Sequence, residues 1–298
     1  MKILTANSSS LGQLKNTTKP RLWLWALVLL VPLLVINLVS FVGPITHLVQ
    51  LSFLQSRAGV ISGTYSLENY ANFFSDGYYW GLIGNSLMMS FTVTLITLGC
   101  SYPIALFLYR MSASSWRNVL FVLTISPLLV SSVVRTYGWM VLLGDQGVLN
   151  SALLGAGLLD HPLRLVNNRI GVAIGLVETL VPYMVLSLMA GFGRLDLSLE
   201  EAAASLGANR IKRFFRIILP LTVPGIALGC LLCFVLAISS FITPKLLGGG
   251  RVFLLATEIY DQAVIQLEWS MAATLSIIVL LIFALTLFLY SQFARRFG

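Results

Sequence analysis

The sequence predicts an all-α polytopic membrane protein, and three observations indicate this fold class. Apolar residues make up 57% of the 298 residues and charged residues only 10%, whereas a soluble domain carries about a quarter charged residues. Several segments of about 20 mostly apolar residues are long enough to cross a hydrocarbon core of roughly 30 Å. The short alternating segments of a membrane β-barrel are absent from the sequence.

We expect six membrane-spanning helices. They cover about residues 22–42, 82–109, 119–143, 170–192, 222–242 and 270–293. The first apolar segment is too long for a cleavable signal peptide and ends at Phe41-Val42-Gly43-Pro44 without a small-x-small site, so it is predicted to be a retained anchor. Residues 1–21, rich in Ser, Thr, Asn and Lys, are predicted to form an N-terminal tail, and residues 22–298 the transmembrane domain.

Charge predicts the orientation. With the N-terminus in the cytoplasm, the inner segments hold 13 of the 19 Lys and Arg residues. An excess of basic residues in short inner loops favours both termini on the cytoplasmic side. Because this topology accounts for the net charge of +8, no nucleic-acid partner is expected.

No motif for catalysis or cofactor binding is found, so the chain is not expected to be an enzyme. Cys100, Cys230 and Cys233 fall within the predicted spans, where small apolar packing is the simpler interpretation. His47 and His161 are too isolated to bind a metal. The chain has no Gly-x-x-x-x-Gly-Lys-Ser/Thr motif, so it is not expected to bind ATP through a P-loop of its own.

Residues 196–220 form a polar, basic segment between two apolar spans. Ser198 and Glu201 fit a capping box, with Ser198 at the N-cap. Gly207 suits a left-handed residue that ends this first short helix. A polar helical loop of this kind is expected to contact something outside the membrane.

A second helix is predicted from about Asn209 to Leu219, where Pro220 and Pro224 close it and lead into the fifth span. Its basic residues can lie at the headgroup level or on an acidic partner. They are Arg210, Lys212, Arg213 and Arg216.

The spacing within this segment carries a resemblance. Glu201-Ala202-Ala203, three residues, Gly207, nine residues and then Ile217-x-Leu219-Pro220 resembles the EAA loop of binding-protein-dependent ABC importer permeases. Glu-Ala-Ala alone would be a weak signal, but this spacing on a loop before the second-to-last span is specific. The alternative is an ordinary amphipathic interfacial helix in which Glu201 only caps.

The resemblance implies a type I importer transmembrane subunit with a MetI-like core, in the inner membrane of a bacterium. It implies that the loop docks in a cleft of a separate ATPase subunit, which binds ATP and Mg. The other implied partners are a second ATPase copy, a second permease subunit, expected to be a paralogue, and an extracytoplasmic solute-binding protein. The implied docking residues are Glu201, Ala202, Ala203 and Gly207, and the implied hinge residues are Ile217, Leu219 and Pro220.

Two further segments resemble the spermidine/putrescine-type branch of this family. They are Arg135-Thr136-Tyr137-Gly138-Trp139 and Thr243-Pro244-Lys245-Leu246-Leu247-Gly248-Gly249. The resemblance implies ATP-driven import of a small polar organic solute, a polyamine or a related compound. Glu268-Trp269-Ser270 departs from the branch, where Asn would precede the Trp, and this leaves the solute open.

One face of the fourth span carries a buried charge. Gly171, Gly175, Glu178 and Pro182 share this face, and Pro182 leaves the carbonyl of Glu178 without a helical partner. An ionised group deep in a span is costly. If span three is a straight helix, Arg135 lies about 7 Å from Glu178 in height, so the two side chains can bridge.

Two interpretations of this pair stay open. It either locks spans three and four together or belongs to a solute path. The candidate path residues are Arg135, Tyr137, Trp139, Glu178 and Tyr183. Gly225-x-x-x-Gly229 likewise fits either a contact with a second permease or packing within one subunit.

Two other functions compete with an importer subunit. An ion-gradient-driven transporter would need intramembrane carboxylates and usually internal repeats, and we find one such carboxylate and no repeat. A non-transporting membrane scaffold would use the basic loop to bind lipid.

Overall fold

The structure is a computed structural model that describes residues 19–294, apart from residues 58, 113 and 194. The chain forms two units, Met1–Gln50 and Leu51–Gly298. Of the predicted tail, residues 1–18 lie outside the described residues. Residues 19–21 already belong to α1 (Lys19–Ser52).

The first predicted span is longer than expected. We predicted that it ends before Gly43-Pro44, but α1 continues through Pro32 and Pro44 to Ser52. Proline removes one backbone hydrogen bond, and helices in an apolar setting tolerate this loss.

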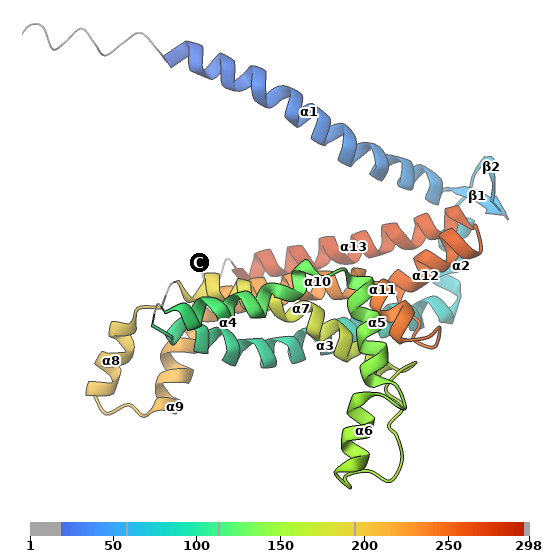
Figure 1. Ribbon diagram of the computed structural model, residues 1–298. Coiled ribbons are helices and arrows are strands. Elements are labelled where there is room, and N and C mark those ends of the chain that lie inside the picture. The colour runs from blue at the N-terminus through green and yellow to red at the C-terminus, as the bar shows by residue number, and fades with distance from the viewer. Residues whose placement is uncertain (1–18, 58, 113, 194, 295–298) are drawn as a thin grey trace, which may run out of the picture. The chain divides into compact units, whose positions relative to one another are not determined.

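Four long helices build the second unit. They are α3 (Gly77–Arg110), α7 (Arg169–Phe192), α10 (Leu219–Ser239) and α13 (Trp269–Ala294). Figure 1 shows them lying along one another. Among the described residues, five helices are long and apolar enough to cross a membrane, or six if one bent pair counts as a span.

Helix α7 lies at the centre of the core, packed against α3 and α10. Its contact with α10 is close: a Cβ added to Gly225 would lie 2.7 Å from the Cα of Gly191. A Cβ added to Gly229 would lie 2.6 Å from Met184 Sδ. The Gly225-x-x-x-Gly229 pair therefore packs within this chain. Gly175 faces α11 (Ile242–Leu247) instead: a Cβ added to Gly175 would lie 2.6 Å from Leu247 Cδ1.

The third predicted span, 119–143, is not one straight helix. It falls on α4 (Ser115–Ile125), a 3₁₀ turn η1 (Ser126–Leu129) and α5 (Ser132–Leu143), and the short α6 (Val148–Gly155) follows it. The two halves are bent by 101°. The reason is local: Pro127 lies in the tight turn and Val130 and Ser131 leave the helical conformation, with ψ of 136° and 133°.

Short elements cover the end of the bundle opposite α8 and α9 (Figure 1). The predicted all-α class holds except for an antiparallel hairpin here, which pairs Arg57 with Val60 around Gly59 at φ +83°. The short elements at this end are β1 (Leu54–Arg57), β2 (Val60–Tyr65), α2 (Glu68–Ser75), α11 (Ile242–Leu247), α12 (Leu255–Tyr260) and the π-helical η3 (Asp261–Ile265).

Candidate functional site

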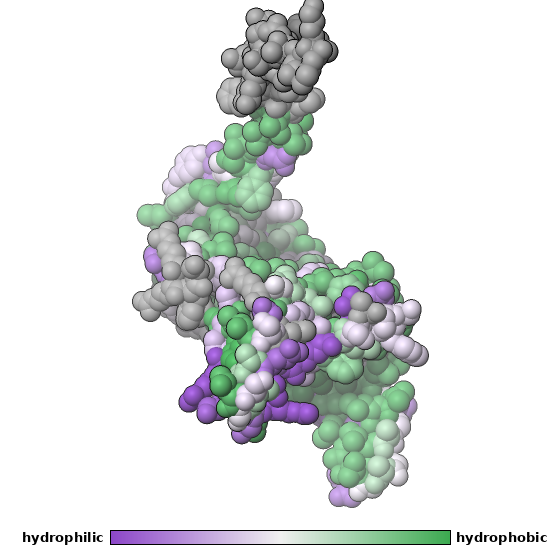
Figure 2. Space-filling model, turned by 90° about the vertical axis from the view of Figure 1, so that its left-hand side faces the viewer, coloured by the Kyte–Doolittle hydropathy of each residue, from purple (hydrophilic) through white to green (hydrophobic). Residues whose placement is uncertain are grey.

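A helical hairpin projects from one end of the bundle (Figure 1). Its first arm is α8 (Leu197–Ser205) and its second is α9 (Arg210–Arg213), which continues through the π-helical η2 (Phe214–Ile218) into α10. Figure 2 shows hydrophilic residues gathered on the end of the molecule that carries this hairpin. We call residues 196–213 the knuckle.

The knuckle begins at Asp196, not at Ser198 as we predicted. The Ser198 backbone N–H donates to Asp196 Oδ1 at 2.9 Å. A hydrogen bond donated to a carboxylate stabilises its ionised form, so this contact lowers the pKa of Asp196. An aspartate caps a helix as well as a serine does, and its charge also favours the helix N-terminus, so the helix starts earlier.

The turn of the knuckle is a Schellman motif centred on Gly207. Gly207 has φ +81°, which confirms the predicted left-handed conformation. Its N–H donates to the Ala204 carbonyl at 2.9 Å, and the Ala208 N–H donates to the Ala203 carbonyl at 3.0 Å. These are the two bonds that define the motif.

The second arm does not end where we predicted. Asn209 caps it by accepting the Lys212 N–H at 2.8 Å, but Pro220 and Pro224 lie inside the continuing helix. Pro220 cannot donate to the carbonyl four residues back, and the Leu219 N–H instead donates to Phe214, five residues back. The wider π turn therefore carries the helix past the prolines.

The predicted docking residues lie together on the outside of the knuckle. Glu201, Ala202 and Gly207 are exposed, and Ala203 is half-buried. The predicted hinge residues lie at the junction with α10: Ile217 and Leu219 are half-buried, and Pro220 is exposed.

Three contacts that we did not predict hold the knuckle in place: two join its first arm and the residue before it to the end of α3, and one joins its two arms. Arg110 Nη2, at the end of α3, lies 2.8 Å from Glu200 Oε2. The Tyr109 hydroxyl donates to the Leu195 carbonyl at 2.7 Å, and Arg213 Nη1 donates to the Glu200 carbonyl at 3.4 Å. The acidic pair Glu200-Glu201 was the available signal: one acid is anchored and the next is presented.

The predicted bridge between Arg135 and Glu178 is present. Arg135 Nε lies 3.2 Å from Glu178 Oε2, with side chains 13% and 25% exposed. The straight-helix height argument behind it was wrong, because the helix breaks before Arg135. At that break Arg135 Nη1 also donates to the Pro127 carbonyl at 2.6 Å. The Pro127 carbonyl also accepts from the Val130 N–H at 3.2 Å, so the arginine adds a second hydrogen bond at the break.

A cleft of about 570 Å³ opens beside this pair. Glu178 and Trp139 line it, together with mostly apolar side chains such as Met88, Ile174 and Phe253. Tyr137 is 54% exposed on α5, and Tyr183 packs against the core. The structure thus brings Arg135, Trp139 and Glu178 together, and it leaves the two tyrosines outside the cleft lining.

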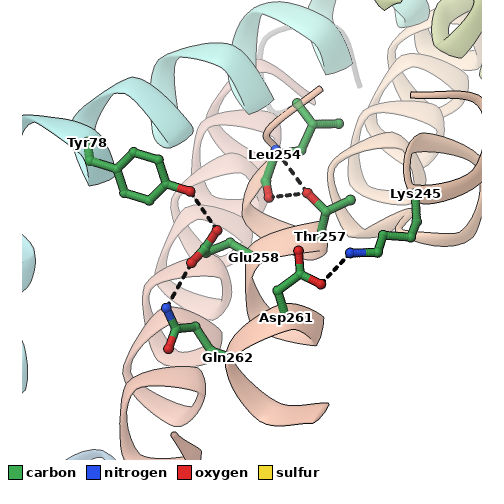
Figure 3. A network of polar contacts seen from close by, with 7 residues as sticks. All are labelled: Tyr78, Lys245, Leu254, Thr257, Glu258, Asp261 and Gln262. Carbon is green, nitrogen blue, oxygen red and sulfur yellow. Dashed lines mark hydrogen bonds and ion pairs between the residues drawn. The ribbon is translucent and has the colours of Figure 1, made fainter. Parts of the chain in front are cut away.

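A polar network lies at the opposite end of the bundle (Figure 3). Glu258, only 7% exposed, accepts from the Tyr78 hydroxyl at 2.7 Å and from Gln262 Nε2 at 2.8 Å. Lys245 pairs with Asp261. These bonds connect α3 with α11, α12 and η3. The last three elements lie almost entirely between the fifth and sixth predicted spans, where we predicted no helix.

This fold defines a class: a polytopic bundle of membrane helices with a capped helical knuckle at one end. The family model described as "Binding-protein-dependent transport system inner membrane component" matches residues 101–298. The chain belongs to that family. It is a multi-pass inner-membrane permease subunit of an ABC importer.

Named relatives support this assignment. The chain is 40% identical over 225 residues to the spermidine/putrescine transport system permease protein PotB of Haemophilus influenzae, covering 76% of this chain and 78% of that protein. It is 36% identical over 245 residues to PotB of Escherichia coli, covering 82% and 88%. A bacterial alginate ABC transporter, crystallised with an alginate pentasaccharide-bound periplasmic protein, shares the fold at 20% identity, with a TM-score of 0.77 over 93% of this chain and 95% of that chain.

Proposed function

We propose that this permease imports polyamines, and that the exposed face of the knuckle is gripped by a separate ATPase subunit. The observation that carries the coupling role is the construction of the knuckle: a Schellman turn at Gly207 presents Glu201 and Ala202 to solvent, while Arg110 holds the neighbouring Glu200. The polyamine substrate is supported by the identity of 36–40% to PotB proteins.

The proposed assembly follows from this role. The knuckle and both chain termini lie in the cytoplasm, where two ATPase copies bind ATP and Mg. A second permease, a paralogue of this one, completes the pathway, and an extracytoplasmic solute-binding protein delivers the polyamine at the opposite end.

Besides its chain link to α7 and the Tyr109–Leu195 hydrogen bond, the knuckle has two connections to the bundle that can transmit a rocking motion. One is covalent, through η2 into α10. The other is the ion pair from Glu200 to Arg110 on α3. We assign Glu201, Ala202, Ala203 and Gly207 to docking. Ile217, Leu219 and Pro220 are assigned to the hinge.

For the solute path we propose the cleft beside Glu178. Its carboxylate and the Trp139 ring suit an ammonium group through charge and the aromatic face. Arg135 offsets that charge at 3.2 Å, so the competing role is a lock between α5 and α7. Tyr137 and Tyr183 are proposed to join the path only if the helices move.

The coupling role is tested with the full transporter in proteoliposomes, loaded with binding protein and spermidine. Glu201→Ala is expected to reduce spermidine-stimulated ATP hydrolysis and uptake together, because it removes the exposed docking carboxylate. Asp145→Ala, which removes an exposed carboxylate from another loop, is the matched control. Stimulated hydrolysis that is unchanged in Glu201→Ala would refute the coupling role.

The solute path is tested with Glu178→Gln, measured for uptake and for thermal stability in detergent. Normal uptake with reduced stability would show that the pair is a lock.

A separate measurement tests the energy source. Uptake that survives ATP depletion and stops with an ionophore would indicate an ion-gradient-driven transporter.

A further inference from the structure

A second cleft, of about 550 Å³, lies where the knuckle meets the bundle. Its polar lining consists of Arg110, Arg210, Arg213 and Glu200. Among the described residues that line it, three are cationic and one is acidic, so their net charge is +2. We call this the arginine cleft.

The one carboxylate of the arginine cleft is already engaged. Glu200 Oε2 pairs with Arg110 at 2.8 Å, and Arg213 reaches only the Glu200 backbone carbonyl, at 3.4 Å. Arg213 Nε is buried and has no hydrogen-bond partner among the described residues. A buried guanidinium donor without an acceptor is costly, and a ligand or ion at this cleft is one explanation for such a group.

Apolar side chains form the other half of the lining. Ile211 is 68% exposed and Phe215 is 61% exposed, directly beside the arginines along the chain. A free inorganic anion has no use for an apolar rim. A molecule with an anionic head and hydrocarbon chains fits both halves.

The position along the helix fits the same ligand. Helix α10 has 21 residues, about 32 Å at 1.5 Å per residue. The hydrocarbon core is about 30 Å thick and the whole bilayer about 40–45 Å. Because α10 alone matches the core, residues 210–218 before it lie at the headgroup layer, and Phe215 lies nearer the acyl chains than Arg210. Figure 2 shows hydrophilic and apolar surface side by side at this end of the molecule.

We propose that the arginine cleft binds the phosphate of an anionic phospholipid, with its acyl chains against Ile211 and Phe215. Arg210 and Arg213 bind the phosphate, and Arg110 contributes while it holds Glu200. Because Arg213 and Arg110 also fix the two arms of the knuckle, the bound lipid stiffens the knuckle. This site is distinct from the exposed docking face at Glu201.

The test uses the purified full chain in a neutral detergent, titrated separately with dioleoylphosphatidylglycerol and dioleoylphosphatidylcholine. Bound lipid is counted by native mass spectrometry. The wild-type chain is expected to retain phosphatidylglycerol selectively. The double variant Arg210→Gln/Arg213→Gln is expected to lose about fivefold in affinity for each arginine removed.

The matched control is Lys212→Gln/Arg216→Gln, which removes the same charge from the same segment outside the cleft lining. It is expected to keep most of the affinity. Equal losses in the two double variants would overturn the proposal, since they would show a diffuse basic surface. If Arg213→Gln unfolds the chain, the single variant Arg210→Gln, at an exposed position, gives the same comparison.

Two further results would overturn the proposal. Displacement of phosphatidylglycerol by an equal concentration of inorganic phosphate would identify a free-anion site. Loss of phosphatidylglycerol when the ATPase subunits assemble would assign the cleft to an acidic residue of that partner. Retention of the lipid in the assembled transporter supports it.

Discussion

The left-handed turn at Gly207 offers the sharpest test of the coupling role. Gly207 has φ +81°, and no heavy atom lies within 4 Å of the position of an added Cβ. Gly207→Ala therefore meets no clash, and its whole cost is the backbone conformation, about 1–2 kcal/mol for an L-residue in this region.

This strain weakens the hydrogen bonds of the turn, and those bonds set the angle between α8 and α9. If the ATPase subunit binds the turn in its native shape, Gly207→Ala is expected to weaken its affinity for the permease by a factor of about 5–30. Gly207→Asn should recover most of the loss, because asparagine visits the left-handed region more readily. The measurement is a titration of the purified ATPase subunit onto the permease in detergent.

Gly99→Ala is the matched control. Gly99 lies within α3 and also has no atom within 4 Å of an added Cβ, but it is helical, so alanine should not weaken binding. Equal affinity for Gly207→Ala, Gly207→Asn and wild type would refute the reasoning, because the left-handed turn would then not be what the partner recognises.

Three further outcomes are expected. Gly225→Ala should cost about 1–3 kcal/mol of stability and lower the thermal midpoint, because its Cβ would meet backbone at 2.7 Å. Gly84→Ala, with open space around it, should not lower the midpoint. Equal midpoints for the two variants would contradict the close helix contact. Glu178→Gln should cost about 3–5 kcal/mol of stability, since both partners of the ion pair are mostly buried. A double-mutant cycle with Arg135→Met should show coupling, and strict additivity would contradict the pair. The stability that the Asp196 cap adds to the knuckle should be fully present above the ordinary pKa of 3.8 and be lost as pH falls through the lower folded-state pKa. Asp196→Asn should remove this pH dependence. The measurement is hydrogen exchange of the knuckle amides as a function of pH.

Features decided by local backbone chemistry could be predicted from the sequence. Gly207 follows a short helix and is followed by polar residues, so its left-handed turn needed no tertiary information. The N-cap was missed by two residues, because Asp196 and Ser198 are nearly equivalent caps and the first well-placed one starts the helix.

The break in the third span, which depends on contacts distant in sequence, could not be predicted, although the Arg135–Glu178 pair was. The break after Pro127 is stable because Arg135 donates to the Pro127 carbonyl and pairs with Glu178 on α7. A helix that merely kinks at proline has the same sequence pattern. The Arg110–Glu200 pair likewise joins residues 90 positions apart, and neither residue alone indicates its partner.

The two connections of the knuckle converge on one helix. Glu200 leads through Arg110 into α3, and Phe214 leads through the π turn into α10. Both α3 and α10 pack directly on α7, which carries Glu178 and one wall of the large cleft. Packed helices transmit displacement because their interiors have no free volume to absorb it, and Gly225 against Gly191 leaves none at the contact between α10 and α7. Under the proposed coupling role, a force applied to Glu201 reaches the cleft by two routes, so loss of the Arg110 ion pair alone would weaken coupling without abolishing it. The Gly207 turn lies on the route into α10, after the branch at Glu200, so a change there leaves the route through Arg110 in place.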